Sequence, residues 1–360
     1  MKCFHCGTKI VSGSGTVAAL KGLAPRRLML VTDPYFAENG TAGRIAAVSG
    51  AATVEIFRDV APDPDVELVA AGTARVKAFC PDVLVALGGG SAMDCAKAML
   101  FFSGAEAKLV AIPTTSGSGS EVTDFAILTH DGVKHPLVDS KIRPDMAILD
   151  AELLQALPKS LIADAGFDVL AHALEASVAL NAGAVTDALA RDAFCKAFSC
   201  LPASFGGDTS VRLAVHLAST MAGMAFSQAG LGLCHAMSHV LGGRFHVPHG
   251  RLNAILLPAV VAFNAAAAAE KYAEMARAAG LGGAAETVAL RNLKNGLIRL
   301  RKELELPATL AQAGISPQKV GKEQAQIVEA VLEDPCCRTN PVPVTKELVM
   351  QVLEAVTGHG

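Results

Sequence analysis

The chain has 360 residues, of which 51% are hydrophobic and 18% are charged, and its formal net charge is -3. A charged fraction below the usual ~25%, together with so many apolar residues, excludes an intrinsically disordered protein. The length suits two domains, and the one basic cluster, at residues 294–302, lacks the aromatic neighbours of a nucleic-acid-binding surface.

The low charge raises the question of a membrane span. Residues 213–243 contain no Asp, Glu, Lys or Arg, but their three histidines and a glutamine would be costly in lipid. We therefore predict buried core helices here and in the second uncharged stretch, residues 252–269. No apolar signal segment is present at the start, and nine scattered cysteines suit a reducing compartment. We expect a cytoplasmic protein without a membrane partner, and we assign no role to Cys3 and Cys6.

The first 150 residues alternate short apolar runs with helical patterns. Alternation of this kind favours parallel strands joined by helical crossovers, which is a Rossmann-like α/β domain. Strands are predicted at residues 27–33, 53–57, 83–88, 109–114 and 146–150, and helices at 66–79 and 92–102.

From about residue 151 the strand signal stops, and the remainder is predicted to be an all-α domain. A turn-rich surface loop is expected at residues 334–343. The domain boundary is placed between residues 158 and 159. The helices are predicted at residues 160–180, 184–199, 211–227, 235–241, 252–279 and 284–305, with shorter segments to the C-terminus.

Two glycine-rich turns are candidates for binding a dinucleotide. The turn at residues 13–18 matches the pattern G-x-G-x-x-A, but the match is short, and we interpret it as a plain turn into a helix. The turn at Gly88–Asp94 follows a predicted strand and opens a helix, which places backbone N–H groups and a helix N-terminus near a pyrophosphate. The next strand ends in a turn rich in glycine and hydroxyl groups, residues 113–123, at the same sheet edge.

Asp33 ends an early predicted strand. A carboxylate there would accept hydrogen bonds from an adenosine ribose and repel a 2′-phosphate, which favours NAD over NADP. The alternative is that Asp33 only caps a turn before Pro34.

Histidines gather in the least charged part of the chain. Asp168 and His172 are four residues apart in a helical pattern, as are His235 and His239, and His249 follows closely. A carboxylate and several neutral imidazoles would bind Fe²⁺ or Zn²⁺ and leave a net positive charge suited to a Lewis acid. From spacing alone, buried core histidines are the alternative.

Four segments together resemble the iron-containing (group III) alcohol dehydrogenases, a family with the dehydroquinate-synthase-like fold. They are GGGSAMDCAKA at 88–98, PTTSGSGSEVT at 113–123, DVLAHALEA at 168–176 and GLCHAMSHVLGGRFHVPHG at 232–250. Three further segments, KHPLVDSKIRPDMAILD at 134–150, AGMAFSQAGLGLCHAMSH at 222–239 and RTNPVP at 338–343, look most like one branch of this family. That branch comprises the 1-propanol dehydrogenases of propanediol-utilising bacteria.

The resemblance implies a role for each matching residue. The metal ligands fall on Asp168, His172, His235 and His249, and His239 falls on the catalytic histidine beside substrate and nicotinamide. Domain 1–158 would then bind NAD(H), and domain 159–360 would hold the metal and carry out catalysis. The implied cofactor contacts are Asp33, Gly89, Gly90, Ser91, Asp94, Thr114, Thr115, Ser118, Thr123 and Lys134.

The implied activity is the reversible NADH-linked reduction of short-chain aldehydes, such as propanal and acetaldehyde, to primary alcohols. Fe²⁺ is the expected metal and Zn²⁺ the alternative, and Phe125, Phe226 and Met237 are either an apolar pocket wall or core. Rival functions are a lyase or cyclase of the dehydroquinate-synthase type and a non-catalytic role in a bacterial microcompartment. Few charges surround the motifs, which disfavours a phosphorylated substrate, and all ligand positions are filled. A homodimer or larger assembly is expected, in which an apolar N-terminal strand around Ile10 could pair across a twofold axis. Microcompartment enzymes are further candidate partners.

Overall fold

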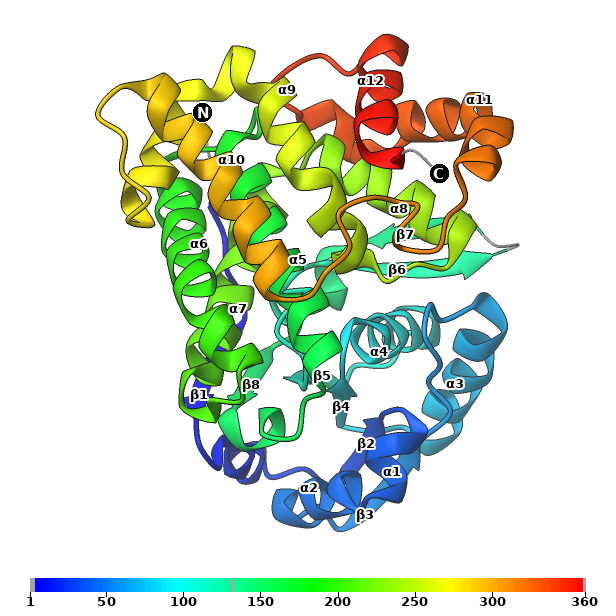
Figure 1. Ribbon diagram of the computed structural model, residues 1–360. Coiled ribbons are helices and arrows are strands. Elements are labelled where there is room, and N and C mark those ends of the chain that lie inside the picture. Colours follow the sequence, from blue (N-terminus) through cyan, green and yellow to red (C-terminus); the bar gives the residue numbers. More distant parts are fainter. Residues whose placement is uncertain (1–3, 131–132, 359–360) are drawn as a thin grey trace. The chain divides into compact units, whose positions relative to one another are not determined.

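The computed structural model describes residues 4–130 and 133–358, so Cys3 lies outside the described residues. The contacts between residues divide the chain into two compact units (Figure 1). An α/β unit runs from Cys6 to Leu157, and a helical unit begins at Pro158 and includes His5.

The α/β unit contains a parallel sheet of six strands in the spatial order β1-β8-β5-β4-β2-β3. The predictions for residues 53–57, 83–88 and 146–150 are confirmed to the residue, and the other two predicted strands are shifted or shortened by one or two residues. The strands are β1 (Lys9–Gly13), β2 (Arg27–Val31), β3 (Thr53–Phe57), β4 (Val83–Gly88), β5 (Lys108–Pro113) and β8 (Met146–Asp150).

Three strands lie outside the five predicted runs, and one of them, β1, is the strand expected around Ile10. β1 lies at the edge of the sheet and is largely exposed, so it lacks a continuous apolar run. The other two, β6 (Phe125–His130) and β7 (Val133–Val138), form a separate antiparallel hairpin. β7 contains Pro136, a residue that usually argues against a strand.

The sheet is buried on both faces, which explains the apolar runs of its central strands. Along β2, Met29 faces one core, with residues of α3 and α4, and Leu30 faces the other, with residues of α2. The unit is therefore doubly wound, as predicted. Its helices are α1 (Pro34–Glu38), α2 (Thr41–Ser49), α3 (Val66–Phe79) and α4 (Gly90–Ser103), with short 3₁₀ helices at Thr16–Leu23, Ser120–Val122, Ser140–Ile142 and Ala151–Leu154.

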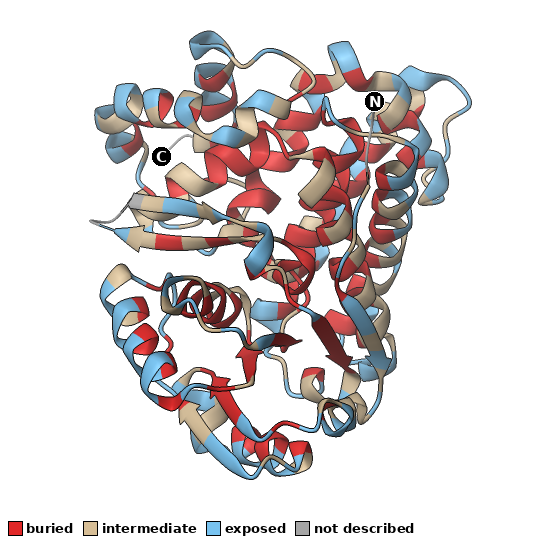
Figure 2. Ribbon diagram, turned by 180° about the vertical axis from the view of Figure 1, so that it is seen from behind, coloured by how far each residue is buried: buried red, intermediate tan, exposed pale blue. Residues whose placement is uncertain are grey.

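The helical unit is built around α5 and α9, most of whose residues are buried (Figure 2). The predicted helices are all present, with ends that differ by a few residues, and the predicted all-α character is confirmed within the described residues. The helices are α5 (Lys159–Val178), α6 (Ala184–Phe205), α7 (Arg212–Ala229), α8 (Leu233–Phe245), α9 (His249–Ala278), α10 (Glu286–Glu303), α11 (Pro317–Glu333) and α12 (Lys346–Thr357), with 3₁₀ turns at Thr209–Val211 and Pro335–Thr339.

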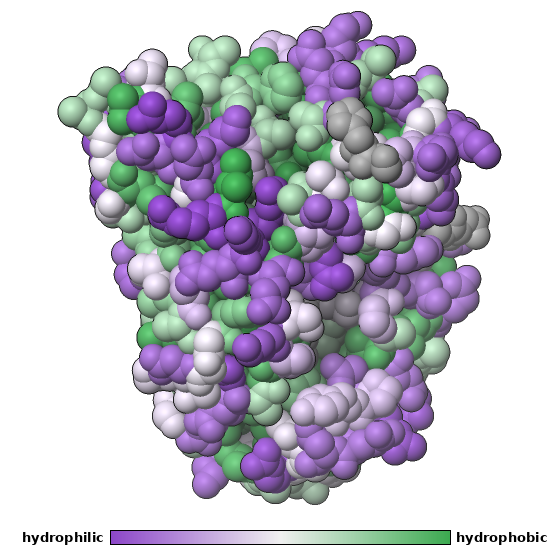
Figure 3. Space-filling view, in the orientation of Figure 1, coloured by the Kyte–Doolittle hydropathy of each residue, from purple (hydrophilic) through white to green (hydrophobic). Residues whose placement is uncertain are grey.

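The uncharged segment 213–243 is two helices, because the chain turns between Ala229 and Leu233. Within the described chain one helix, α9, is long and apolar enough to cross a membrane, and 61% of its most apolar window is buried inside the structure. The face drawn in Figure 3 mixes hydrophilic and apolar side chains. Burial of these segments agrees with the prediction of core helices.

The prediction of a surface loop at residues 334–343 is wrong for part of that segment. Asn340 is buried, and its side chain accepts a hydrogen bond from Leu233 N at the start of α8 (3.1 Å). It also exchanges two hydrogen bonds with Asn264 of α9, at 2.9 and 2.8 Å. The composition of the segment indicates turns, but its polar side chain at Asn340 is buried because it pairs with buried N–H groups of neighbouring helices.

Candidate metal centre and cofactor site

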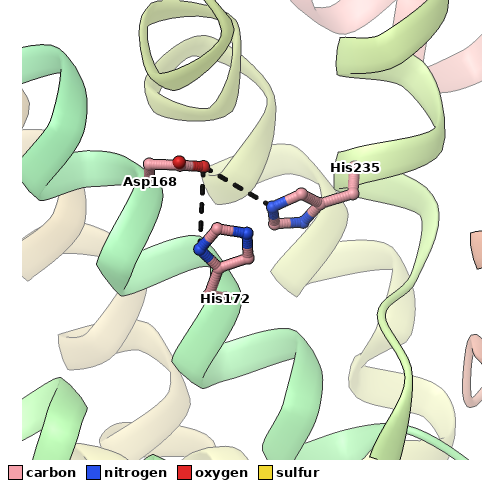
Figure 4. A group of neighbouring side chains, drawn as sticks. All are labelled: Asp168, His172 and His235. Carbon is pink, nitrogen blue, oxygen red and sulfur yellow. Dashed lines mark ion pairs between the residues drawn. The ribbon is translucent and has the colours of Figure 1, made fainter. Parts of the chain in front are cut away.

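Asp168 and His172 project from the same face of α5. They are separated by one helical turn, and both are buried in the middle of the helix. Figure 4 shows their side chains turned toward His235, which comes from the first turn of α8. The structure therefore brings Asp168 and His172 together with His235.

A single carboxylate oxygen faces three imidazoles. Asp168 Oδ1 lies 3.8 Å from His172 Nδ1, 3.6 Å from His235 Nε2 and 3.5 Å from His249 Nε2. His249 is the first residue of α9, which begins three residues before the predicted start of this helix. The four side chains thus come from three helices, α5, α8 and α9, and lie close to one another.

These four side chains fit a divalent metal ion. Bonds of about 2.0–2.1 Å in a tetrahedral arrangement place neighbouring ligand atoms about 3.3–3.5 Å apart, close to the three distances observed. Potential ligand atoms of Asp168, His172 and His235 all lie within 4.8 Å of one another. One carboxylate and neutral imidazoles also form a donor set that Fe²⁺ and Zn²⁺ accept.

Glu175 orients His235 from behind. Its carboxylate is buried, and Oε2 lies 2.6 Å from His235 Nδ1, which leaves Nε2 of the same ring directed at Asp168. The same carboxylate accepts backbone hydrogen bonds from Gly232, Cys234 and His235, and so binds the positive end of α8. A carboxylate behind a metal-facing imidazole fixes the tautomer that can bind the ion.

A second set of contacts orients Asp168. Asn253, one turn after His249 on α9, donates a hydrogen bond from Nδ2 to Asp168 Oδ1 at 2.8 Å. Its own oxygen accepts from Ser238 Oγ at 2.5 Å, so the carboxamide cannot easily rotate. Both side chains are fully buried.

Of the three residues considered for a pocket wall, Met237 is core, because it is fully buried in α8. Phe226 is also buried, and its ring stacks on His172 with centroids 4.3 Å apart. Phe125 lies in the α/β unit, on β6. Phe226 therefore supports a ligand of the candidate metal set.

The electrostatics favour an ionised carboxylate at this point. Burial would raise the pKa of Asp168, but the neighbouring imidazoles, that of His172 first, outweigh it and hold the pKa below its ordinary value. Burial lowers the pKa of His235, yet hydrogen bonds to the Asp168 and Glu175 carboxylates raise it to about 9. Removal from water and the nearby imidazoles hold the pKa of His249 well below its usual range.

His239 has a different partner. It lies one turn after His235, and its Nδ1 is 2.9 Å from Asp334 Oδ2. Its ring stacks on that of His249, with centroids 5.2 Å apart, and about a quarter of its side chain, 28%, is exposed. His239 is therefore beside the four-residue set, with a carboxylate holding one ring nitrogen and the other free to face a small molecule.

In the α/β unit, the glycine-rich turn after β4 lies at the topological switch point of the sheet. The chain leaves β2 toward β3 and returns to the other side of β2 at β4, so the loops after β2 and β4 diverge. Gly88 has a φ of +149°, and a Cβ there would lie 2.7 Å from that of Ala92. Asp33 caps α1 through Phe36 N, and its Oδ2 lies 3.7 Å from the same point beside Gly88. Dinucleotides bind at such a point.

The first glycine-rich turn is occupied by the protein itself. Asp150 accepts hydrogen bonds from Gly15 N and Val17 N, both at 3.0 Å, and Glu152 accepts one from Ser14 Oγ. The donors that a pyrophosphate would need are thus already used. The turn leads into a 3₁₀ helix, as the interpretation of a plain turn requires.

The two candidate cofactor turns lie against each other, because β4 and β5 are neighbours with Gly88 opposite Pro113. A Cβ on Gly89 would lie 3.3 Å from Thr115 Oγ1, and one on Gly90 would lie 3.4 Å from the Cβ of Ser118. Thr114 N donates to Gly88 O at 2.9 Å. The structure thus brings these predicted cofactor residues together.

Beneath these turns is a buried lysine that the sequence did not indicate. Lys97 Nζ donates to Ser120 Oγ, Thr123 Oγ1 and two backbone carbonyl oxygens, at 2.6–3.0 Å. Ser120 Oγ in turn donates to Asp94 Oδ1 at 3.1 Å. Burial lowers the pKa of Lys97 to about 8 and raises that of Asp94 to about 6, and their mutual attraction opposes both shifts.

Lys134, on β7, is placed beside the glycine-rich turn through Asp63. Its Nζ lies 2.7 Å from Asp63 Oδ1, and Asp63 N donates to Ser91 Oγ at 3.3 Å. Every predicted cofactor residue therefore lies on the turns that follow β2, β4 and β5 or next to them.

Several residues of the site were missed although helical spacing could have indicated them. Glu175 is three residues after His172, and Asn253 is four residues after His249, so each shares a helix face with a candidate ligand. Asp334 comes from a distant loop and left no signal in the sequence.

The α/β unit has a glycine-rich turn at the switch point of its sheet, and the helical unit has one carboxylate among three imidazoles. Together these features define a class of metal- and dinucleotide-dependent oxidoreductases. Residues 7–151 match the model of the iron-containing alcohol dehydrogenases, and residues 162–357 match that of the C-terminal part of the Fe-containing alcohol dehydrogenase family. The chain belongs to the iron-containing alcohol dehydrogenase family, and it is a metal-dependent alcohol dehydrogenase.

Individual relatives agree with this assignment. The chain is 39% identical to 1-propanol dehydrogenase PduQ of Salmonella typhimurium, over 98% of this chain and 99% of the relative. It is 36% identical to an NADPH-dependent butanol dehydrogenase of Clostridium saccharobutylicum, over 99% and 98% of the two chains. An iron-containing alcohol dehydrogenase structure from Thermococcus thioreducens superimposes with a TM-score of 0.90 at 32% identity, covering 98% of this chain and all of the other. The lyase or cyclase alternative is not favoured by these relatives.

Proposed function

We propose that the chain reversibly reduces short-chain aldehydes to primary alcohols with NADH, using a metal ion held by Asp168, His172, His235 and His249. The observation that carries this proposal is the position of Asp168 Oδ1, 3.5–3.8 Å from a nitrogen of each of the three imidazoles. Residues 1–158 would bind the dinucleotide and residues 159–360 the metal. Fe²⁺ is the proposed ion, with Zn²⁺ as the alternative that the same donors accept.

When bound, the ion would supply Lewis acidity toward a substrate oxygen, and NADH would supply the hydride. The segments around Asp168, His172 and His235, residues 166–178 of α5 and 233–238 of α8, are buried and would keep water from that side of the reacting group. Electrostatic stabilisation of a developing alkoxide is stronger in such a dry site.

His239 is the proposed proton carrier. Asp334 holds Nδ1, so Nε2 is the atom that would give a proton to the product oxygen or take it from the alcohol. Asp334 thereby fixes the orientation of the ring, and the exposed part of His239 offers a route for the proton to solvent.

NAD(H) is proposed over NADP(H) because of Asp33. Its carboxylate lies beside Gly88 of the glycine-rich turn, where it would accept hydrogen bonds from a ribose and repel a 2′-phosphate. The proposed cofactor contacts are Asp33, Gly89, Gly90, Ser91, Asp94, Thr114, Thr115, Ser118, Thr123 and Lys134.

Aldehydes of two to four carbons are the proposed substrates, with propanal foremost. Support comes from the similarity over nearly the whole chain to a 1-propanol dehydrogenase and a butanol dehydrogenase. The same similarity to PduQ supports a proposed cytoplasmic location, including the interior of a bacterial microcompartment with its other enzymes. A homodimer is proposed because β1 is an edge strand and Ile10 on it is exposed.

The direct test replaces His235 with Ala. The variant should lose metal, measured by elemental analysis of the purified protein, and lose propanal-dependent oxidation of NADH together with it. His246→Asn is the matched control, because His246 is exposed at the end of α8 with a left-handed backbone that Asn tolerates. Full activity in a metal-free His235 variant would overturn the proposal.

A further inference from the structure

The helical unit contains a cavity of about 980 Å³ that none of the candidate metal or cofactor residues lines. Its walls come from the start of α5, the first turn of α9, the last turns of α10 and the segment at residues 304–313. Hydrophilic side chains, interrupted by apolar ones, cover the front of α10 in Figure 3. The volume is that of a typical small-molecule site.

The charge on these walls is strongly one-sided. Four cationic side chains line the cavity, those of Lys159, Arg251, Arg301 and Lys302, and among the described residues of the lining Glu305 is the single acid. The whole chain is slightly acidic, with a net charge of -3. Arg251 is paired with Asp164 at the edge of the lining, so the net excess at this concave site is two positive charges. This excess is a local feature and does not reflect the composition.

The guanidinium of Arg301 gives the strongest indication that an anion binds in this cavity. It is partly buried, and burial lowers its pKa. Its Nη1 donates to the carbonyl oxygen of Ala254 at 3.3 Å, a neutral acceptor that offsets little of the desolvation. Lys159 likewise lies over the ring of Phe205, 5.0 Å from the centroid, rather than beside a carboxylate. An anion placed here would supply the charge that both groups lack.

We propose that this cavity binds a phosphorylated small molecule. The guanidinium of Arg301 offers planar N–H donors that match phosphate oxygens, and the lysines add charge at the rim. Asp164 holds Nε and Nη2 of Arg251, so Arg251 would contribute its remaining nitrogen, Nη1, unless the ion pair opens. The remaining wall is apolar, with Phe205, Ile298 and Leu306, so it suits the carbon skeleton that carries the phosphate. Inorganic phosphate alone would leave most of this volume empty.

Occupancy of the cavity is coupled to the metal set, a step that rests on the proposed function. Arg251 forms a two-point ion pair with Asp164, at 3.1 and 2.9 Å, and so joins the first turn of α9 to α5. Asp164 is one turn before Asp168, and Arg251 is two residues after His249. A phosphate that draws Arg251 into the cavity weakens this pair and shifts two of the metal-facing side chains.

Glucose 6-phosphate is a suitable probe, with glucose as the uncharged control. Isothermal titration into the metal-loaded protein at saturating NADH should show one site, and binding should weaken as salt is added. Lys302→Gln should weaken it by about threefold or more, the effect of removing one charge–phosphate contact at a surface. Lys294→Gln removes the same charge from the exposed face of α10 outside the cavity and should change nothing.

Failure of glucose 6-phosphate to bind at millimolar concentration would overturn the site. An equal loss of affinity in Lys302→Gln and Lys294→Gln would also overturn it. Binding that vanishes at saturating NADH would place the phosphate in the dinucleotide site and would also overturn it. Metal affinity, measured by competition with a chelator, should shift several-fold with glucose 6-phosphate and not with glucose, and an unchanged affinity would refute the coupling. Absence of metal binding without any phosphate would count against the proposed function alone.

Discussion

Glu175→Gln tests whether a residue that contacts no substrate controls the metal set. The glutamate accepts four hydrogen bonds at the start of α8. Oε2 receives those of Gly232 N, His235 N and His235 Nδ1, and Oε1 receives that of Cys234 N. A glutamine can keep its oxygen on the Oε2 side, but its NH₂ group then points at the N–H of Cys234.

The expected change in free energy follows from the hydrogen bond and the negative charge that the substitution removes. One hydrogen bond to a buried carboxylate contributes about 1.5–3 kcal/mol, and a negative charge at a helix N-terminus about 0.3–1 kcal/mol. Together the substitution should cost about 2–4 kcal/mol. Part of this cost appears as lower stability of the metal-free protein, and part as weaker metal binding, because the His235 ring loses its charged partner. Loss of such an orienting carboxylate lowers metal affinity by about 10–100-fold.

The assay is a titration of Zn²⁺ against a chelator of known affinity, alongside urea unfolding of the metal-free protein. Glu329→Gln is the matched control, because Glu329 is exposed on α11 and the same atoms change. Lower stability with a metal affinity within about twofold of wild type would show that Glu175 is structural only. No change in either quantity would refute the hydrogen-bond reasoning itself.

Three further substitutions test the rest of the site. Asp33→Asn keeps the oxygen that caps α1 but removes its negative charge. The ratio of kcat/KM with NADPH to kcat/KM with NADH should therefore rise about tenfold, which corresponds to ~1.4 kcal/mol. An unchanged ratio would show that Asp33 is a helix cap only. Asp334→Asn should lower kcat for propanal reduction by about tenfold or more with the metal content intact, because its carboxylate contacts His239; loss of metal would contradict this. Burial raises the pKa of Asp94 from 3.8 to about 6, so the folded state holds this proton more tightly than the unfolded chain. Its contribution to stability is complete below about pH 4 and is lost as the pH rises through about 6. The free energy of unfolding of wild type relative to Asp94→Asn should therefore fall over this range in urea titrations, and a difference independent of pH would refute the shift.

The strands that the sequence predicts well are those buried on both faces. β4 is buried along its entire length, so it reads as an unbroken apolar run. β1 is an edge strand and β7 contains a proline, and neither carries that pattern. Burial by tertiary neighbours, which local sequence does not record, decides these cases.

The candidate site was predictable where one helix face carries it and not where distant segments meet. Asp168 and His172 stand out by their spacing on α5. Residues that hold the site from other segments, such as Asp334 and Asn340, lie in a stretch whose composition indicates only a surface loop. Their role is to hydrogen-bond polar groups of α8, and this role can be recognised only once the packing of the helices is known.

The choice between His239 and His249 shows the limit of spacing most clearly. His235 and His239 share one face of α8, so spacing alone would favour that pair as metal ligands. His249 approaches Asp168 instead because Gly250 follows it. A Cβ at Gly250 would lie 1.9 Å from the carbonyl oxygen of Asp164, so only glycine lets the first turn of α9 contact α5 there. A larger residue at this position would push His249 away from Asp168, and the chain would keep its histidines while losing the geometry that lets them act together.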